Sequence, residues 1–204
     1  MAPRTPLIRP VQYFSGTEDV YTAGYGVFAL NMLFRLVGVW LLFRYLRLQI
    51  VDSPDPFTGS VGSIFGASLI VTGLFMFGGW CLVAGLVHAR FAGSETEDYR
   101  DALGVVGWSY APNLVVAPLQ FGVVLSELRP IVSDTTTPEM VQRELMAVEA
   151  VQTEPAGLGL LLLSTVWSVY ILAQGIEAIY DPLTYEAWTI ALLVGGGSVL
   201  FAFA

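Results

Sequence analysis

The sequence predicts an all-α membrane protein, a bundle of five transmembrane helices. Hydrophobic residues make up 55% of the 204 residues, charged residues make up only 13%, and the mean hydropathy is +0.66. This composition leaves too little polar surface to cover a water-soluble globule. Five segments also reach or approach the roughly 20 apolar residues that a membrane-spanning helix needs. A soluble enzyme is therefore excluded.

We expect one membrane domain over residues 1–204, and five spans would place the two chain ends on opposite sides of the membrane. Residues 1–24 lack the apolar core of a secretory signal, so no cleaved leader is expected. The predicted spans cover approximately residues 25–43, 64–88, 103–125, 157–180 and 187–204.

The connections between the spans carry their own signals. Two prolines and two acids between Asp52 and Pro56 predict an extended loop before the second span. Ser94 and Glu97 have the spacing of a capping box, which predicts the start of the next helix. Within the longest connection, the pattern over residues 137–151 predicts a short amphipathic helix between spans 3 and 4. It either lies on the membrane or bundle surface or is simply solvated, and the sequence leaves both open.

Small residues are frequent in the second apolar segment. Such residues let a neighbouring helix approach closely in a bilayer. We expect that neighbour to belong to the same bundle, and a seam between two copies is the alternative. The residues concerned are Gly62, Gly66, Gly73, Gly78 and Gly79.

The charge balance is strongly acidic. Seventeen Asp and Glu residues face nine basic residues, all of them Arg, and the formal net charge is −8. High salt screens an acidic surface, so we infer a salt-accumulating halophile of the archaeal type. Base-composition drift in a GC-rich genome would also replace Lys with Arg. No basic surface exists for nucleic acid, and the arginines are split evenly between the two predicted sides, so charge does not fix the orientation.

The sequence gives no sign of catalysis. One His and one Cys cannot assemble the usual metal or nucleophile sets in a single chain. We therefore predict no catalytic residues, no cofactor and no metal, and we interpret His88, at the end of the second span, as an interfacial anchor.

Arg35 is the residue that opposes membrane insertion most. It lies about ten residues into the first span, where a cation costs roughly 2.5 to 3.5 kcal/mol. Asn113 in the third span lies at a similar depth, and Pro112 beside it leaves the carbonyl of residue 108 without its usual donor. We hypothesise that Arg35 reaches Asn113 or that carbonyl. The alternative is that Arg35 extends to the lipid headgroups.

Two further features are candidates for structure or function. Pro112 and Pro118 predict kinks in the third span, and Ser109 is placed to bond the strained turn. Glu177, with Gln174 one turn earlier, is an ionisable residue near the end of the fourth span.

Several stretches of the chain resemble the Yip family, multispanning membrane proteins named for interaction with Ypt and Rab GTPases, in its prokaryotic form. Residues 10–14 (PVQYF) resemble the family's element before the first span, and residues 166–190 resemble its fourth and fifth spans. Residues 85–112 give the strongest match. They end in a Gly-aromatic-Ser-x-x-Pro motif filled by Gly107, Trp108, Ser109 and Pro112, with Trp where Tyr is usual.

The resemblance implies five helices with a cytoplasmic N-terminus, in the cytoplasmic membrane. The family's GTPase-binding role in vesicle traffic transfers poorly, because the long acidic N-terminal region and the Asp-Leu-Tyr-Gly-Pro motif of eukaryotic relatives are missing.

From these observations we expect a non-enzymatic membrane scaffold or interaction protein. Its expected partners are the lipid bilayer, and either other membrane proteins or a second copy of the chain. The alternative is a small transporter or channel subunit with Arg35, Asn113 and Glu177 as its polar lining.

Overall fold

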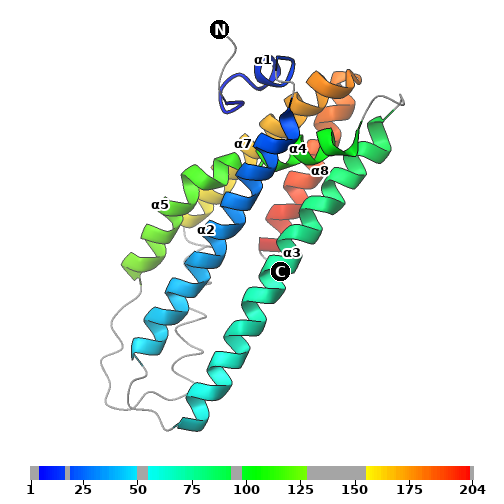
Figure 1. Cartoon of the computed structure of the whole chain (residues 1–204). Helices are drawn as coiled ribbons and strands as arrows, with labels where there is room; N and C mark the ends of the chain where they lie inside the picture. The colour runs from blue at the N-terminus through cyan, green and yellow to red at the C-terminus, as the bar shows by residue number, and fades with distance from the viewer. Residues whose placement is uncertain (1–4, 17–18, 50–54, 93–97, 128–154, 203–204) are drawn as a thin grey trace.

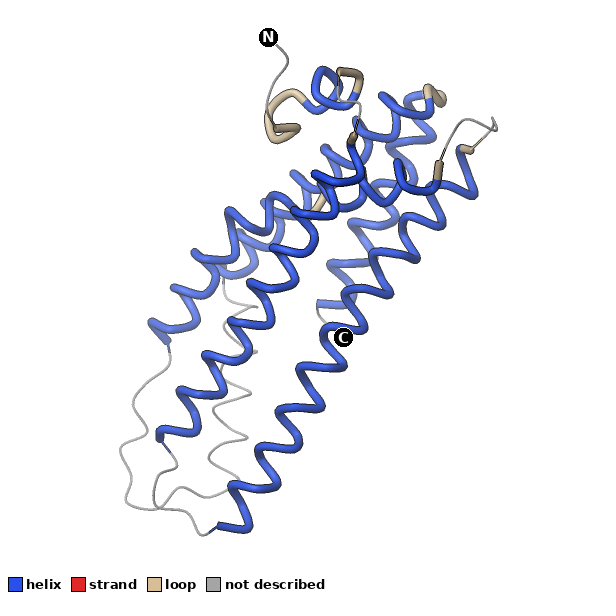
Figure 2. Tube along the Cα trace, viewed as in Figure 1, coloured by secondary structure: helices blue, strands red, loops and turns tan. Residues whose placement is uncertain are grey.

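The protein is helical wherever its structure is described. The structure is a computed structural model, and it describes residues 5–16, 19–49, 55–92, 98–127 and 155–202. These ranges contain no strand (Figures 1 and 2), which confirms the all-α class. The helices, labelled as in Figure 1, are α1 (Pro10–Phe14), α2 (Val20–Gln49), α3 (Asp55–Phe91), α4 (Tyr99–Trp108), α5 (Ala111–Glu127), α7 (Pro155–Tyr180) and α8 (Thr184–Ala202).

The long helices form an antiparallel bundle suited to a bilayer. Successive long helices run in opposite directions, and the N-terminus lies at what we call the upper end, the top of Figure 1. α8, with 19 residues, packs along α7 and is the fifth long apolar helix. Four segments of the described residues are long and apolar enough to cross a membrane: Val20–Leu41, Phe65–Phe91, Tyr99–Val123 and Pro155–Tyr180.

Helix α2 begins five residues before the predicted position. The expected start was residue 25, but the helix starts at Val20 because Asp19 caps it, accepting a hydrogen bond of 2.9 Å from the Thr22 amide. Hydrogen bonds from the Thr22 side chain and amide hold the pKa of Asp19 below its usual value.

Helix α3 is longer than predicted and packs differently. It starts at Asp55, so part of the expected loop is helical, and Pro56 is tolerated because it falls in the first turn. With 37 residues it is about 55 Å long, which exceeds the hydrocarbon thickness. A Cβ added at Gly66, Gly73, Gly78 or Gly79 would meet nothing within 4 Å. Among the described residues, the prediction that these four glycines pack inside the bundle is therefore wrong, while the surroundings of Gly62 lie outside what the structure describes. A seam between two copies stays a hypothesis.

The third predicted span is broken rather than merely kinked. α4 ends at Trp108 and α5 starts at Ala111, so Pro112 stands in the first turn of a new helix and only Pro118 lies inside one. α4 starts after Asp98, whose side chain accepts from the Arg100 amide at 3.2 Å, and not at the predicted capping box of residues 94–97. Residues 93–97, and the predicted amphipathic helix of residues 137–151, lie outside the described residues.

The packed core lies at the upper end of the bundle. α4 lies across the upper parts of α2 and α3 and also contacts α7 (Figure 1). The short helix α1 covers α7: the Trp167 indole donates to the Leu7 carbonyl at 2.8 Å, and the ring of Tyr13 meets Trp108 edge-on at 5.2 Å. The predicted N-terminal element is thus a helix that closes this end of the molecule.

The backbones of α2 and α4 touch where the two helices cross. A Cβ at Gly24 would overlap the carbonyl oxygen of Gly104, and one at Gly107 would overlap the carbonyl oxygen of Gly24. A Cβ at Gly104 would lie only 2.8 Å from the backbone of Val20. Only glycine fits at these three positions. Gly104 and Gly107 lie three residues apart on one face of α4, and they meet Val20 and Gly24, which lie four residues apart on one face of α2. This crossing fixes α4 against α2.

Candidate intramembrane cavity

The helices separate below the core and leave a partly open cavity of about 780 Å³. Its walls come from α2, α3, α5, α7 and α8, with Val106 and the turn after α4 at its top. Cavities of this size in proteins hold ligands of the size of a drug or a lipid headgroup. A cavity at the middle of a membrane bundle is therefore the strongest candidate functional site of this chain.

Most of the wall is apolar, and a limited set of polar side chains faces the cavity. Polar groups within spans are rare and mark ligand or ion paths more often than other positions do. Arg35 is the only charged residue among the described residues of the wall. The polar residues are Arg35 on α2, Thr72 on α3, Ser109 and Tyr110 in the turn, Asn113 and Gln120 on α5, Ser164, Thr165 and Ser168 on α7, and Ser198 on α8.

The break between α4 and α5 places three of these residues. The chain turns at Ser109 and Tyr110 before α5 begins. The Ser109 hydroxyl donates to the Val106 carbonyl at 2.7 Å, as the sequence predicted for a strained turn, and Pro112 is fully buried behind it. As a result Ser109, Tyr110 and Asn113 all face the cavity.

Arg35 and Asn113 share the cavity, as expected from their similar depths. Arg35 lies close enough to Tyr110 for the two groups to interact electrostatically. Within the described part of the chain, Arg35 makes no hydrogen bond or ion pair, with Asn113 or any other residue. The direct contact and the extension to lipid headgroups both stay hypotheses. Asn31, one turn before Arg35, is fully buried, and its amide makes no hydrogen bond to a described residue.

Comparison of the chain with models of known protein families gives a match to one family. The model of the Yip1 domain matches residues 7–204. The chain belongs to the Yip1-domain family. Searches of curated proteins and of solved structures find no match to it. Together with the apolar helices, the family establishes a multi-pass membrane protein.

The family motif of this Yip1-domain protein has a clear structural role. Gly107 allows α4 to touch α2, Ser109 bonds the last turn of α4, and Pro112 lies in the first turn of α5. The motif therefore builds the break that places Tyr110 and Asn113 on the cavity wall. Ser164, Ser168 and Ser198 complete the wall and escaped sequence reasoning, although Ser164 and Ser168 stand one helical turn apart in an apolar span.

Glu177 does not line the cavity. It lies near the upper end of α7, where the Gln174 amide donates to its Oε2 at 2.7 Å and its Oε1 is buried without a partner among the described residues. The predicted neighbours Glu177 and Gln174 are indeed hydrogen-bonded. Both residues are separated from Arg35 by the packed core. In this Yip1-domain protein the two ionisable positions thus belong to different regions.

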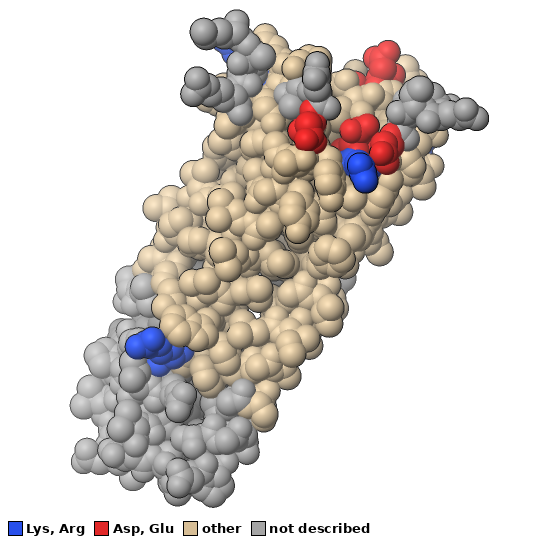
Figure 3. All heavy atoms as spheres, in the orientation of Figure 1, with Lys and Arg blue, Asp and Glu red and all other residues tan. Residues whose placement is uncertain are grey.

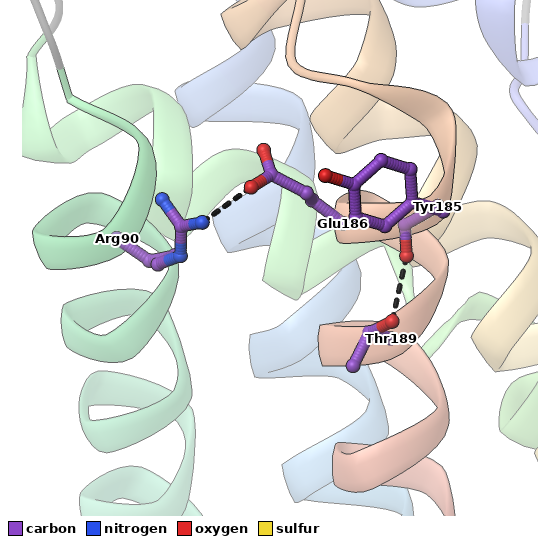
Figure 4. Close-up of polar contacts among 4 residues, drawn as sticks. All are labelled: Arg90, Tyr185, Glu186 and Thr189. Atoms are coloured by element: carbon purple, nitrogen blue, oxygen red, sulfur yellow. Dashed lines mark hydrogen bonds and ion pairs between the residues drawn. The ribbon is translucent and has the colours of Figure 1, made fainter.

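On the face of this Yip1-domain protein that Figure 3 shows, the described charged residues lie toward the two ends of the bundle, and the surface between them is uncharged. At the upper end Arg90 of α3 pairs with Glu186 of α8 at 2.5 Å, beside the Thr189 hydroxyl that donates to the Tyr185 carbonyl (Figure 4). Side chains as exposed as that of Arg90 (53%) gain at most about 1 kcal/mol from such a pair. His88 lies two residues before Arg90 on α3, and its ring meets the Tyr99 ring edge-on with centroids 5.7 Å apart.

Proposed function

We propose that this chain is a non-enzymatic membrane interaction protein that recognises another component of the bilayer in its cavity. The observation that carries the proposal is the cavity itself: one end of the bundle is closed by the core, while the described side chains of the other half leave a space unfilled. A bundle that served only as an anchor would gain stability by filling this space. Family membership supports a role in interaction.

Filling the cavity is expected to weaken what the protein binds. Ser168→Trp adds a large ring to the cavity wall of α7, whereas Val166→Trp adds the same ring on the outer face of the same helix, where Val166 is 68% exposed. We expect the first variant to lose most of the components that co-purify with the tagged wild-type chain from its native membrane, and the second to keep them. Mass spectrometry of the purified samples measures both.

Two outcomes of that experiment would contradict the proposal. Equal recovery of partners from both variants would separate the interaction from the cavity. Recovery of the wild-type chain alone, with no stoichiometric lipid or protein, would remove the interaction function. The extraction is done at high salt, because we propose that the excess of acidic residues adapts the chain to a salt-accumulating, haloarchaeal type of cell.

The second candidate function is a small transporter or channel subunit. The polar groups at mid-depth favour it, since transporters bind their substrates near the middle of the membrane. Transport would also require the packed upper core to open. Flux of ions or solutes through proteoliposomes that contain the purified chain, blocked by Ser168→Trp, would support this function over the first.

We propose that the chain lies in the cytoplasmic membrane with its N-terminus in the cytoplasm, as the resemblance to the Yip family implies. The prediction is tested by labelling intact cells with a membrane-impermeant maleimide, in a Cys81→Ser background. We expect Ile8→Cys, which is 81% exposed at the upper end, to react only after the cells are opened. Arg44→Cys, toward the other end of α2, should react in intact cells, and the reverse pattern would invert the orientation.

A further inference from the structure

The cavity holds a cation without a counter-charge in its described wall. Arg35 lies within the candidate span Val20–Leu41, six residues before its end, and nine residues or about 13 Å along the helix before Arg44. No Asp or Glu is found among the described residues that line the cavity. A guanidinium at this depth stays charged, and it is stable there only with an anion or with several hydrogen-bond acceptors. The geometry therefore calls for an anion that the chain's described wall does not supply.

Two further donors stand on the same wall. The Tyr110 hydroxyl and the Asn113 amide both line the cavity, and neither side chain bonds another described residue. Several other wall groups are already used: the hydroxyls of Ser109, Ser164 and Ser198 each donate to a carbonyl of their own helix. Tyr110 and Asn113 thus offer donors on the wall that also carries Arg35. A guanidinium together with O–H and N–H groups is the chemistry that binds phosphate or carboxylate.

The rest of the wall is suited to an apolar chain. Phe34, Phe75, Met76, Phe121 and Leu161 are among the side chains that surround the space. The volume of about 780 Å³ is far larger than one inorganic anion. Arg35 is also exposed in the isolated protein, so the cavity is open beside a span, where the surroundings are lipid. An amphiphile with an anionic head and an apolar tail matches these three features.

We propose that the cavity binds the anionic phosphate or carboxylate group of a membrane lipid, with Arg35 as its anchor and Tyr110 and Asn113 as additional donors. This rests on the proposed function and gives it a ligand class. The same anionic group could also come from a solute in water, and the apolar wall and the opening beside a span favour the lipid. The test separates the two sources.

The experiment titrates the purified full-length chain in a non-ionic detergent. Its melting temperature is followed with short-chain phosphatidylglycerol, with the matched zwitterionic phosphatidylcholine, and with inorganic phosphate. We expect the anionic lipid to raise the melting temperature of the wild-type chain and the zwitterionic lipid not to do so. Arg35→Gln should weaken the apparent affinity for phosphatidylglycerol about tenfold or more, because a charge-assisted bond is lost.

The control is Arg44→Gln. It removes one exposed cation from the same helix, outside the cavity, and is expected to leave the affinity unchanged. Arg35→Lys keeps the charge but not the forked donor, so its loss should be smaller than that of Arg35→Gln. Asn113→Leu should weaken binding independently of Arg35, and it decides the question if Arg35→Gln does not fold.

Equal shifts with both lipids, or no dependence on Arg35 and Asn113, would overturn the proposal. A shift that inorganic phosphate alone reproduces, with the same dependence on Arg35, supports the anion site and assigns its ligand to the aqueous phase. The proposed function fails separately. If the chain binds no anion but still co-purifies with a protein partner, only the anion site is contradicted. If the chain conducts anions and the flux depends on Arg35, the anion site is supported and the function is transport instead of interaction.

Discussion

Gly24→Ala is expected to lower the free energy of unfolding by about 3 kcal/mol, the upper part of the range for overpacking. For a chain of this size that corresponds to roughly 6 to 12 °C in melting temperature. The added methyl would overlap the Gly104 carbonyl oxygen and lie 2.7 Å from the Gly104 Cα. These are backbone atoms, which cannot rotate away as a side chain can. α2 and α4 must therefore separate, and every contact of α4 with the core weakens with them.

The matched control for this prediction stands two residues away. A Cβ at Gly26 meets nothing within 4 Å, so Gly26→Ala should be neutral or stabilising, because alanine favours a helix over glycine by about 1 kcal/mol. Thermal unfolding in detergent, followed by tryptophan fluorescence, measures both variants. Equal melting temperatures for the two variants would contradict the close contact between the backbones of α2 and α4. Gly24→Ala combined with Gly107→Ala should cost less than the sum of the two, since one separation relieves both overlaps.

The sequence predicted which segments cross the membrane better than it predicted which faces touch. Segments are selected by the cost of placing polar groups in lipid, and this cost is large. Faces are ambiguous, because the residues that contact lipid and those that contact another helix are both apolar. Gly73 and Gly78 in a glycine-rich stretch of α3 therefore looked like packing positions and are open. Gly104 and Gly107 carry the close crossing, yet the sequence did not mark Gly104, and it marked Gly107 only through the family motif and not as a packing position.

Some residues of the candidate site could be predicted from the sequence and others could not. Arg35 and Asn113 could be found from sequence, because a charge and an amide stand out within apolar runs. Ser168 and Ser198 could not, because small hydroxyl residues occur on any face of a spanning helix and bond their own backbone. The break at Ser109 was interpreted as a kink, since a proline indicates a disturbed turn but not how far the two halves diverge. The cavity depends on that divergence.

The second large effect concerns Trp80, which attaches α3 to the rest of the bundle. Its side chain is 2% exposed, its indole N–H donates to the Leu103 carbonyl at 3.0 Å, and its ring stacks on Phe28 with centroids 4.4 Å apart. One residue of α3 thus contacts both α2 and α4. Trp80→Ala should cost about 3 kcal/mol, at the low end for removing a buried tryptophan. Lipid can take up part of the apolar surface, but not the stacking or the hydrogen bond.

Two variants separate these contributions. Trp80→Phe keeps a ring against Phe28 and loses mainly the N–H donor. It should therefore lower the free energy of unfolding by only about 1 kcal/mol. Leu82→Ala removes a side chain of the same helix that is 63% exposed, and its melting temperature should stay near that of the wild-type chain. Similar melting temperatures for Trp80→Ala and Leu82→Ala would show that other contacts hold α3.

Trp80→Ala should also change the cavity, because Trp80 holds the helix that forms one of its walls. Met76 and Thr72, which line the cavity, lie on α3 one and two turns before Trp80. Below that level the residues of α3 open toward lipid, with Leu74 at 66% and Phe75 at 75% exposure. Loss of the Trp80 attachment should therefore move the α3 wall outward and weaken the binding of anionic lipid along with stability. Gly26→Ala, which touches neither wall nor core, should weaken neither stability nor binding. A Trp80→Ala chain that melts early yet binds normally would show that the α3 wall is not needed for the site.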